Sequence, residues 1–249
     1  MGSAARGGDG SGGGVGGVLS GIAVALGLVL FLAGFGWAAL VYRPYTVPTS
    51  SMTPTIDAGD RVLAQRVDGD EVRRGDVVVF RDTGWVTNAP VVKRVVAVGG
   101  DKVACCTDGR LTVNGRQVEE PYLPKGSTAE IQGFPAVTVP KGRLFLLGDE
   151  RQGSLDSTAH LTDAARGTVA RSAVSARVDS VIWPMKGMIA RPTGFETLGK
   201  LSQPGPLRLI EAMIVGGAVL VLAGGAYGPV AARLGRSRAR TRQEAVGAA

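Results

Sequence analysis

The stretch from Tyr45 to Arg66 reads YTVPTSSMTPTIDAGDRVLAQR, and the rest of the chain is organised around it. Ser51 lies here in a loop bounded by prolines, a few residues beyond a long apolar segment, and a polar–apolar alternation typical of a β-strand follows. A hydroxyl in such an extended loop is a candidate nucleophile. The alternative is structural, because serines in turn-like loops commonly hydrogen-bond their own backbone. The choice therefore depends on the partners that the fold brings to Ser51.

Two apolar segments flank this stretch, one near each end of the 249-residue chain. Residues 15–41 contain no charged side chain, a length that exceeds the roughly 20 residues needed by a transmembrane helix. A second uncharged run, residues 212–232, is also about long enough to span a bilayer. The apolar core of a cleaved signal peptide is shorter, about 7–15 residues. We therefore expect an uncleaved anchor at each end of a central domain.

The arginines beyond the second apolar run predict the orientation of the chain. The tail after residue 232 carries five arginines and a single acid, Glu244, and a short basic flank of this kind stays in the cytoplasm. With two spans, the N-terminus lies on the same side and the central domain is extracytoplasmic. The tail supplies four of the net +7 formal charge, so topology explains the basic composition and nucleic-acid binding is not indicated.

These patterns divide the chain into five parts. We expect a flexible cytoplasmic tail at residues 1–14, a transmembrane helix at 15–42, an extracytoplasmic β domain at 43–205, a second transmembrane helix at 208–232 and a basic cytoplasmic tail at 233–249. The chain is thus predicted to be a multi-pass protein of the plasma membrane, in contact with the lipid bilayer.

The central domain has the pattern of antiparallel β structure. Asn114–Gly115 is a strong hairpin signal between two short apolar runs. We predict a loop at Trp85–Pro90, an irregular excursion punctuated by proline and glycine at Pro121–Pro140, and a strand at Arg143–Leu147. Helical periodicity is weak in this region. The fold class is therefore a mostly β domain of antiparallel sheets, barrel-like or sandwich-like, flanked by two transmembrane α-helices.

Lys93 is the side chain to weigh as a partner of Ser51. In the predicted strand around it, Lys93 shares one face with Val91 and Val95, and both faces are mostly apolar. In a central strand the lysine would be desolvated, its pKa would fall and its neutral amine could accept a proton. On an edge strand its charged head would instead extend into water. The strand alone leaves both interpretations open.

A further polar segment, Gly148–His160, reads GDERQGSLDSTAH directly after an apolar strand. Ser154 could hydrogen-bond an amine here, and Asp149 and Asp156 could bind backbone amides or an arginine. An ordinary surface turn rich in Asp and Ser is the alternative. His160 is the only histidine of the chain, and it lies in an irregular stretch with nothing to fix its tautomer, so we disfavour a Ser/His/Asp triad.

Cys105 and Cys106 are the only cysteines. Adjacent cysteines can bond only through a strained eight-membered ring, so we favour two packed thiols over a labile disulfide. No cluster of His, Cys and acidic residues has the spacing of metal ligands.

Four motifs in this order resemble bacterial type I signal peptidases, the membrane-bound serine proteases that remove signal peptides from exported preproteins. The motifs are PTSSMTPT at residues 48–55, GDRVLAQR at 59–66, RGDVVVF at 74–80 with VVKRVVAVGGDKV at 91–103, and GDERQGSLDS at 148–157. They are similar to the family's nucleophile box, the strand after it, the box of the general base and the last box. A second span with a cytoplasmic tail resembles some Gram-positive members, and the composition suggests an actinobacterial form.

The resemblance implies that Ser51 attacks the peptide carbonyl while neutral Lys93 takes its proton, giving an acyl-enzyme that water hydrolyses. Thr49 and the Ser51 backbone amide would form the oxyanion hole. The substrates would be secretory preproteins with small residues, such as alanine, at the cleavage site. Neither a metal nor a cofactor would be needed.

The last box departs from the family's usual pattern. By the resemblance, Ser154 would orient the lysine amine, and Asp149 and Asp156 would be supporting acids. The residues that differ from the usual pattern are Glu150, Gly153 and Thr158. The last of them replaces an arginine that would pair with Asp156, so the sequence leaves that ion pair open.

Two other functions remain open. A catalytically impaired relative acting in surface-protein assembly is one, because the last box is altered, although both Ser51 and Lys93 are present. The other is a self-cleaving regulator that resembles the repressor proteases with the same catalytic pair. Those proteins lack membrane spans, which counts against this alternative.

Overall fold

The computed structural model of the chain describes residues 14–87, 89–124 and 133–247. It divides into two compact units, a helical unit from the two ends of the chain and a central unit, Val41–Gly205. The predicted N-terminal tail, residues 1–14, lies outside the described residues except for Gly14, where the first helix begins.

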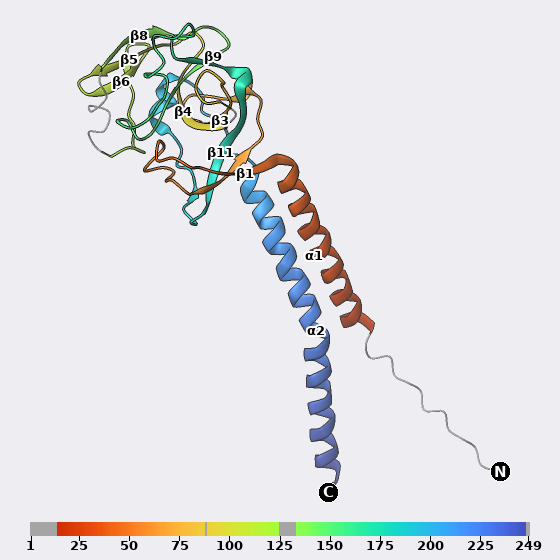
Figure 1. The fold of residues 1–249 in the computed structure, drawn as a ribbon. Coiled ribbons are helices and arrows are strands. Elements are labelled where there is room, and N and C mark those ends of the chain that lie inside the picture. Colours follow the sequence, from red (N-terminus) through yellow and green to blue (C-terminus); the bar gives the residue numbers. More distant parts are fainter. Residues whose placement is uncertain (1–13, 88, 125–132, 248–249) are drawn as a thin grey trace, which may run out of the picture. The chain divides into compact units, whose positions relative to one another are not determined.

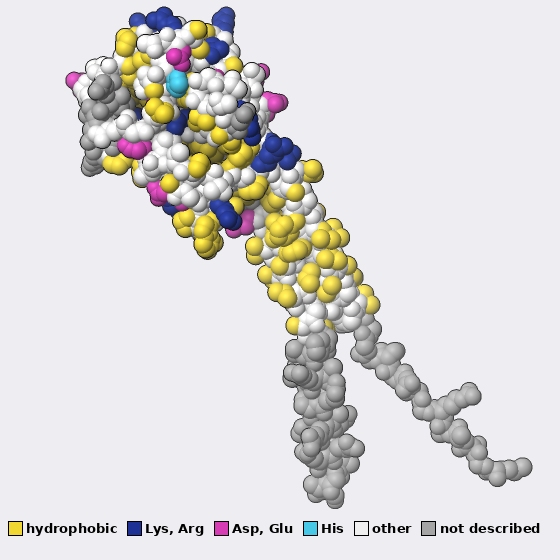
Figure 2. All heavy atoms as spheres, in the orientation of Figure 1, with side chains coloured by type: hydrophobic (Ala, Val, Ile, Leu, Met, Phe, Trp, Pro, Cys, Tyr) yellow, Lys and Arg dark blue, Asp and Glu magenta, His cyan; other side chains and the backbone are white. Residues whose placement is uncertain are grey.

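The helical unit consists of α1 (Gly14–Val41) and α2 (Leu207–Gly247), drawn in red and blue in Figure 1. By length and composition, residues 16–41 and 207–227 could each cross a membrane. Apolar side chains cover the visible face of both segments, as Figure 2 shows, and Leu222 is 72% exposed. The second apolar run and the tail predicted after it belong to one continuous helix, which ends at Gly247.

Small residues one heptad apart bring the two helices into close antiparallel contact. A Cβ built on Gly27 would lie 2.7 Å from the carbonyl oxygen of Gly217, and a Cβ on Gly34 would lie 2.8 Å from the Ile214 side chain. Ser20 Oγ donates a hydrogen bond to the Gly224 carbonyl oxygen at 2.7 Å. In a bilayer, helices associate through close packing and such polar contacts, because lipid tails remove the hydrophobic drive.

The central unit contains two antiparallel sheets (Figure 1). The larger sheet has the order β1-β2-β11-β3-β4-β9-β10, with β12 paired to β11, and the smaller has the order β7-β6-β5-β8. The strands of the larger sheet are β1 (Tyr42–Thr46), β2 (Arg61–Gln65), β3 (Val77–Phe80), β4 (Val91–Val98), β9 (Arg143–Leu147), β10 (Thr168–Ala170), β11 (Val174–Trp183) and β12 (Gly187–Met188). Those of the smaller sheet are β5 (Lys102–Thr107), β6 (Arg110–Val113), β7 (Arg116–Gln117) and β8 (Phe134–Thr138).

The mostly β fold predicted from the sequence is confirmed, and so is the strand at Arg143–Leu147. Asn114 and Gly115 join β6 to β7 with φ angles of 53° and 75°, the positive values that a two-residue hairpin turn requires. The irregular excursion predicted at Pro121–Pro140 is wrong in part, because it contains β8. A proline inside β8 is tolerated because β8 is the edge strand of its sheet.

The expectation of two free thiols is also wrong, since Cys105 and Cys106 form a disulfide. In a regular strand, successive side chains point to opposite faces. The pairing of β5 shifts register between Ala104 and Thr107 towards β6, and between Val103 and Cys105 towards β8. These irregularities interrupt the alternation at the two cysteines.

Apolar clusters cover both faces of the larger sheet. Val77 and Val79 of β3 pack with Met52 in one cluster, whereas Val78 and Phe80 pack in another. All four residues of β3 are buried, and β4 lies between β3 and β9. The interpretation in which the charged head of Lys93 extends into water is therefore wrong, because the residue is only 3% exposed, although Val91 to Lys93 pair with β3 alone.

The helix contact predicts different outcomes for two neighbouring glycines of α2. A Cβ at Gly217 would lie 2.6 Å from the Gly27 carbonyl oxygen, whereas a Cβ at Gly216 meets nothing within 4 Å. We expect Gly217→Ala to weaken helix pairing by the about 1–3 kcal/mol typical of overpacking, and Gly216→Ala to leave it unchanged. Amide hydrogen exchange along α1 in the membrane-embedded chain measures the pairing. Equal exchange rates in the two alanine variants would contradict this packing.

Candidate active site

Ser51 lies in a turn that two buried apolar side chains hold in place. Met52 and Ile56 are fully buried, and Ile56 N donates to the Met52 carbonyl oxygen at 2.9 Å. From β4, Lys93 Nζ donates a hydrogen bond to Ser51 Oγ at 2.6 Å. The structure thus brings together two candidate residues that are 42 positions apart in the sequence.

Lys93 is held in a dry environment. Lys93 is only 3% exposed to solvent. Desolvation lowers the pKa of Lys93 from 10.5 to about 8, and the charges of Asp156 and Asp149 oppose this decrease. Half of the Lys93 side chains are therefore neutral when the pH equals this pKa. A neutral amine can accept a proton instead of donating one.

Thr49 lies on the exposed side of the same turn. Its Oγ1 atom is 3.3 Å from Ser51 Oγ. Thr49 is exposed and Ser51 is half-buried, whereas Lys93 is buried. The side of Ser51 that faces Thr49 is therefore the side from which a carbonyl group could approach.

Ser154 packs beside the nucleophile turn but does not make the bond expected of it. Its Oγ atom is buried and has no hydrogen-bond partner, so the predicted contact with Lys93 is absent in this structure. Gly148 explains the close approach. A Cβ there would lie 2.1 Å from Ser154 Oγ and 2.4 Å from the Ser51 carbonyl oxygen, so only glycine fits between these two serines.

Asp149 binds an arginine that the sequence analysis did not single out. Arg94 Nε and Nη2 donate to its two carboxylate oxygens at 2.8 and 2.6 Å, and both side chains are fully buried. Thr55 Oγ1 also donates to Asp149, and Arg94 Nη1 donates to the Gly75 carbonyl oxygen at 2.9 Å. The pair thus ties β4 to the turn that carries Ser51 and to the segment after β9.

Asp156 makes its contacts without an arginine. Its Oδ2 atom accepts from Gly148 N at 2.9 Å, and its Oδ1 atom accepts from Thr158 N at 3.0 Å and from Thr158 Oγ1 at 2.7 Å. Among the described residues no salt bridge to Asp156 is found. The Thr158 hydroxyl therefore takes the place of the missing guanidinium, but it leaves the charge of Asp156 unneutralised.

A second buried ion pair, between Arg151 and Glu120, was also missed. Arg151 Nη2 lies 2.6 Å from Glu120 Oε1, and the side chains are 1% and 4% exposed. Arg94, alternating with apolar residues in β4, could have been recognised as a buried cation that needs a carboxylate. Glu120 carried no such signal, because it lies outside any periodic segment.

His160 makes its contacts away from Ser51. Its Nδ1 atom is 2.8 Å from Asp163 Oδ2, and its ring stacks on Trp85 at a centroid distance of 4.6 Å. Neither contact is with Ser51, so a Ser/His/Asp triad remains disfavoured, but the expectation that nothing fixes the His160 tautomer is wrong, because Asp163 binds Nδ1. Within the part of the chain that the structure describes, no group of three or more His, Cys, Asp or Glu side chains could hold a metal ion.

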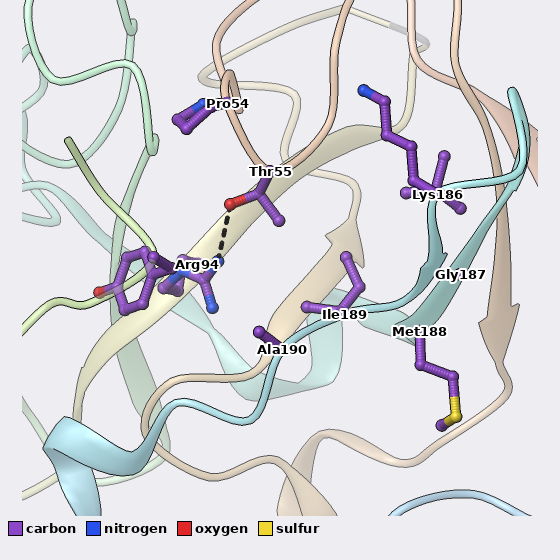
Figure 3. A pocket seen from close by; sticks show the side chains of 10 residues that line it. Pro54, Thr55, Arg94, Lys186, Gly187, Met188, Ile189 and Ala190 are labelled. Carbon is purple, nitrogen blue, oxygen red and sulfur yellow. Dashed lines mark hydrogen bonds between the residues drawn. The ribbon is translucent and has the colours of Figure 1, made fainter.

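A cavity of about 280 Å³ lies beside the turn after Ser51 (Figure 3). Thr55 and Arg94 point toward each other at its wall, with Nη2 3.3 Å from Oγ1. The opposite wall is mostly apolar and comes from the segment around β12, including Met188 and Ile189. Neither Ser51 nor Lys93 lines this cavity, so it is separate from the reactive pair.

Comparison with known proteins gives a consistent result. A family model described as "Signal peptidase, peptidase S26" matches residues 19–183. A signal peptidase I of Mycobacterium tuberculosis is 34% identical over 216 residues, covering 67% of this chain and 71% of that protein. Signal peptidase IB of Staphylococcus aureus is 33% identical over 182 residues, covering 66% of this chain and 86% of that protein. A solved signal peptidase I from Enterococcus faecalis matches with 25% identity and a TM-score of 0.33, covering 47% of this chain and 96% of that chain.

The family match spans the nucleophile turn, both sheets except β12, and the segment after β9. It includes the positions at which Ser51, Lys93, Asp149 and Ser154 were picked out from their chemistry. The chain therefore belongs to the signal peptidase family, peptidase S26.

Proposed function

We propose that this chain is a membrane-bound peptidase that removes signal peptides from secreted preproteins, with Ser51 as nucleophile and Lys93 as general base. The observation that carries the proposal is the 2.6 Å contact between Lys93 Nζ and Ser51 Oγ, made by a lysine that is almost completely buried. A serine hydroxyl needs an adjacent base to become a nucleophile, and a desolvated amine can be that base.

The proton movements follow from the state of the lysine. When Lys93 is charged it donates to Ser51 Oγ, and when it is neutral the serine hydroxyl donates to Nζ. Only the neutral form can accept the proton as Ser51 Oγ bonds to the substrate's carbonyl carbon. The resulting ammonium then protonates the leaving amine as the peptide bond breaks. Water hydrolyses the acyl-enzyme by the same proton path, which regenerates Ser51 and neutral Lys93.

The oxyanion formed in this reaction needs donors on the accessible side of Ser51. We assign the Ser51 backbone amide and the Thr49 hydroxyl to that role, because Thr49 Oγ1 lies 3.3 Å from the attacking oxygen. Each such donor contributes about 10²–10³ in rate in related acyl-transfer sites. Asp149, through Arg94, and Asp156, through Gly148, hold the surrounding backbone in this scheme.

The pairing pattern of β4 supports a binding mode for the substrate. β9 pairs with β4 from Arg94 onward, whereas Val91 to Lys93 pair only with β3. An extended peptide could add to this open side of the strand next to the reactive pair. Tyr45 and Val92, which pack partly buried against the cluster that contains Met52, would contact the small residues before the cleaved bond.

The proposed site of action is the plasma membrane, with the central unit on the extracytoplasmic side. The two apolar helices and the arginines of the tail support this orientation. The end of β11 and the turn that follows it also expose apolar side chains suited to contact with lipid. These are Ile182, Trp183 and Met185, which are 40%, 65% and 90% exposed.

The direct test compares the full chain with two variants, Ser51→Ala and Lys93→Ala, on a membrane-embedded preprotein with an Ala-x-Ala site. We expect the wild type to release the mature N-terminus and both variants to lose at least about 10³ in rate, since each removes a member of one catalytic unit. Ser50→Ala is the matched control, because it keeps the same turn and the Lys93–Ser51 contact. A folded wild type that does not cleave would instead favour a catalytically impaired relative with a role in surface-protein assembly.

The unneutralised charge of Asp156 predicts a shift in pH dependence. The rate should rise with pH through about 8, because deprotonation of Lys93 creates the base. Burial lowers the pKa of Lys93 and Asp156 opposes this effect, so a cation paired with Asp156 should lower that pKa further. We expect Thr158→Arg to move the midpoint of kcat/KM at least about half a unit toward acid pH.

Two substitutions control for this experiment. Thr158→Ala removes the hydroxyl contact without adding charge, and Thr162→Arg adds a charge at an exposed position of the same segment. An equal shift with Thr162→Arg would show that the effect is not specific to Asp156. A midpoint that stays in place with Thr158→Arg would contradict the coupling between Asp156 and Lys93.

A further inference from the structure

Two side chains of the segment after β7, Glu120 and Tyr122, contact the buried arginines of the candidate site. Glu120 accepts hydrogen bonds from both terminal nitrogens of Arg151. Nη2 lies 2.6 Å from Oε1, and Nη1 lies 2.8 Å from Oε2. The Tyr122 hydroxyl donates to Glu120 Oε1 at 2.6 Å. Burial raises the pKa of Tyr122 well above its usual value, and the Glu120 charge adds to this, so the hydroxyl remains a donor.

Arg151 transmits this contact to the residue that separates the two serines. Its Nε atom donates to the Gly148 carbonyl oxygen at 2.9 Å. On its other side, Gly148 N donates to Asp156 at 2.9 Å, and its α-carbon faces Ser154 and the Ser51 carbonyl oxygen with no room for a Cβ. Arg151 and Asp156 therefore hold the Gly148 peptide groups from both ends.

Tyr122 makes the second connection. The guanidinium of Arg94 lies over its ring, with the central carbon 3.8 Å from the ring centroid. Arg94 follows Lys93 in β4 and forms the buried pair with Asp149. One short segment thus contacts both buried arginines that flank the reactive pair.

We propose that Glu120 and Tyr122 are positioning residues for the cleavage reaction, which hold Gly148 and β4 so that Ser51 and Lys93 meet in reactive geometry. This inference rests on the proposed function. It assigns to a segment next to the smaller sheet a part in catalysis that acts through Arg151, Gly148 and Arg94.

A purely stabilising role makes a different prediction. Buried ion pairs often contribute little net stability, because desolvation offsets their attraction, and apolar side chains of similar volume can replace them without loss. Such a replacement would remove the Nε donor to Gly148 as well. Replacing both Glu120 and Arg151 by apolar side chains can therefore restore stability without restoring the contact that holds Gly148.

The experiment uses the full chain with Glu120→Gln, with the double substitution Glu120→Leu and Arg151→Met, and with Tyr122→Phe. Glu119→Gln is the matched control, because the neighbouring Glu119 pairs with Arg110 at the surface, where the side chains are 69% and 49% exposed. Thermal unfolding, kcat and KM are measured for each variant. Amide hydrogen exchange of residues 148–151 is measured in parallel and does not depend on catalysis.

We expect Glu120→Gln to lower both the unfolding midpoint and kcat, and the double variant to regain the midpoint while kcat stays about 10- to 100-fold below wild type, as expected for a misplaced reacting group. KM should change less than kcat. Tyr122→Phe keeps the ring under Arg94 and loses only the hydroxyl contact, so its kcat should fall less than that of the double variant. Exchange at residues 148–151 should quicken in the Glu120 variants and stay unchanged in Glu119→Gln.

Three results would overturn the inference: recovery of kcat together with stability in the double variant, unchanged exchange at residues 148–151, or an equal effect of Glu119→Gln. The exchange result decides the question whether or not the wild type cleaves a preprotein. Faster exchange in the variants, combined with a wild type that does not cleave, would count against the proposed function and leave the positioning contact in place.

Discussion

The burial of Lys93 is the constraint on which the rest of the site depends. An ammonium group loses hydration in a buried strand, and among the described residues no carboxylate forms a salt bridge with Nζ, so the charged form is disfavoured and the pKa falls to about 8. The larger sheet provides this environment by topology, because β4 lies between β3 and β9 and apolar clusters cover both faces. Ser51 then needs only to be brought within hydrogen-bond distance, which the buried side chains of Met52 and Ile56 achieve.

Gly148 is the point at which the separate parts of the site meet. It has no side chain, so Ser154 and the Ser51 backbone can approach it together, and its peptide groups bond to Asp156 and Arg151. The charged side chains around it thus bond to its backbone. Asp156 also accepts a hydrogen bond from the Thr158 hydroxyl, at the position where the resemblance implied an arginine.

Local patterns in the sequence predicted what depends on local chemistry. Apolar runs indicated the two long helices and the strand at Arg143–Leu147, and ordered motifs indicated Ser51 and Lys93. Contacts between distant segments were not predictable in this way. The Glu120–Arg151 pair joins residues 31 positions apart. The sequence around each of them does not indicate which side chain it pairs with. The missed strand β8 contains a proline and has glycines nearby on both sides. These residues indicate a loop unless the strand is known to lie at the edge of a sheet.

The pKa of Lys93 is the quantity that tests the account most directly. It can be measured by nitrogen-15 NMR titration of lysine side-chain amines in the full chain, with Lys93→Arg to assign the signal and Ser51→Ala to exclude turnover. The account predicts a titration midpoint near 8, well below the ordinary value of 10.5. A midpoint at or above 10.5 would leave almost no neutral Lys93 to act as a base, and it would contradict the proposal that this lysine activates Ser51.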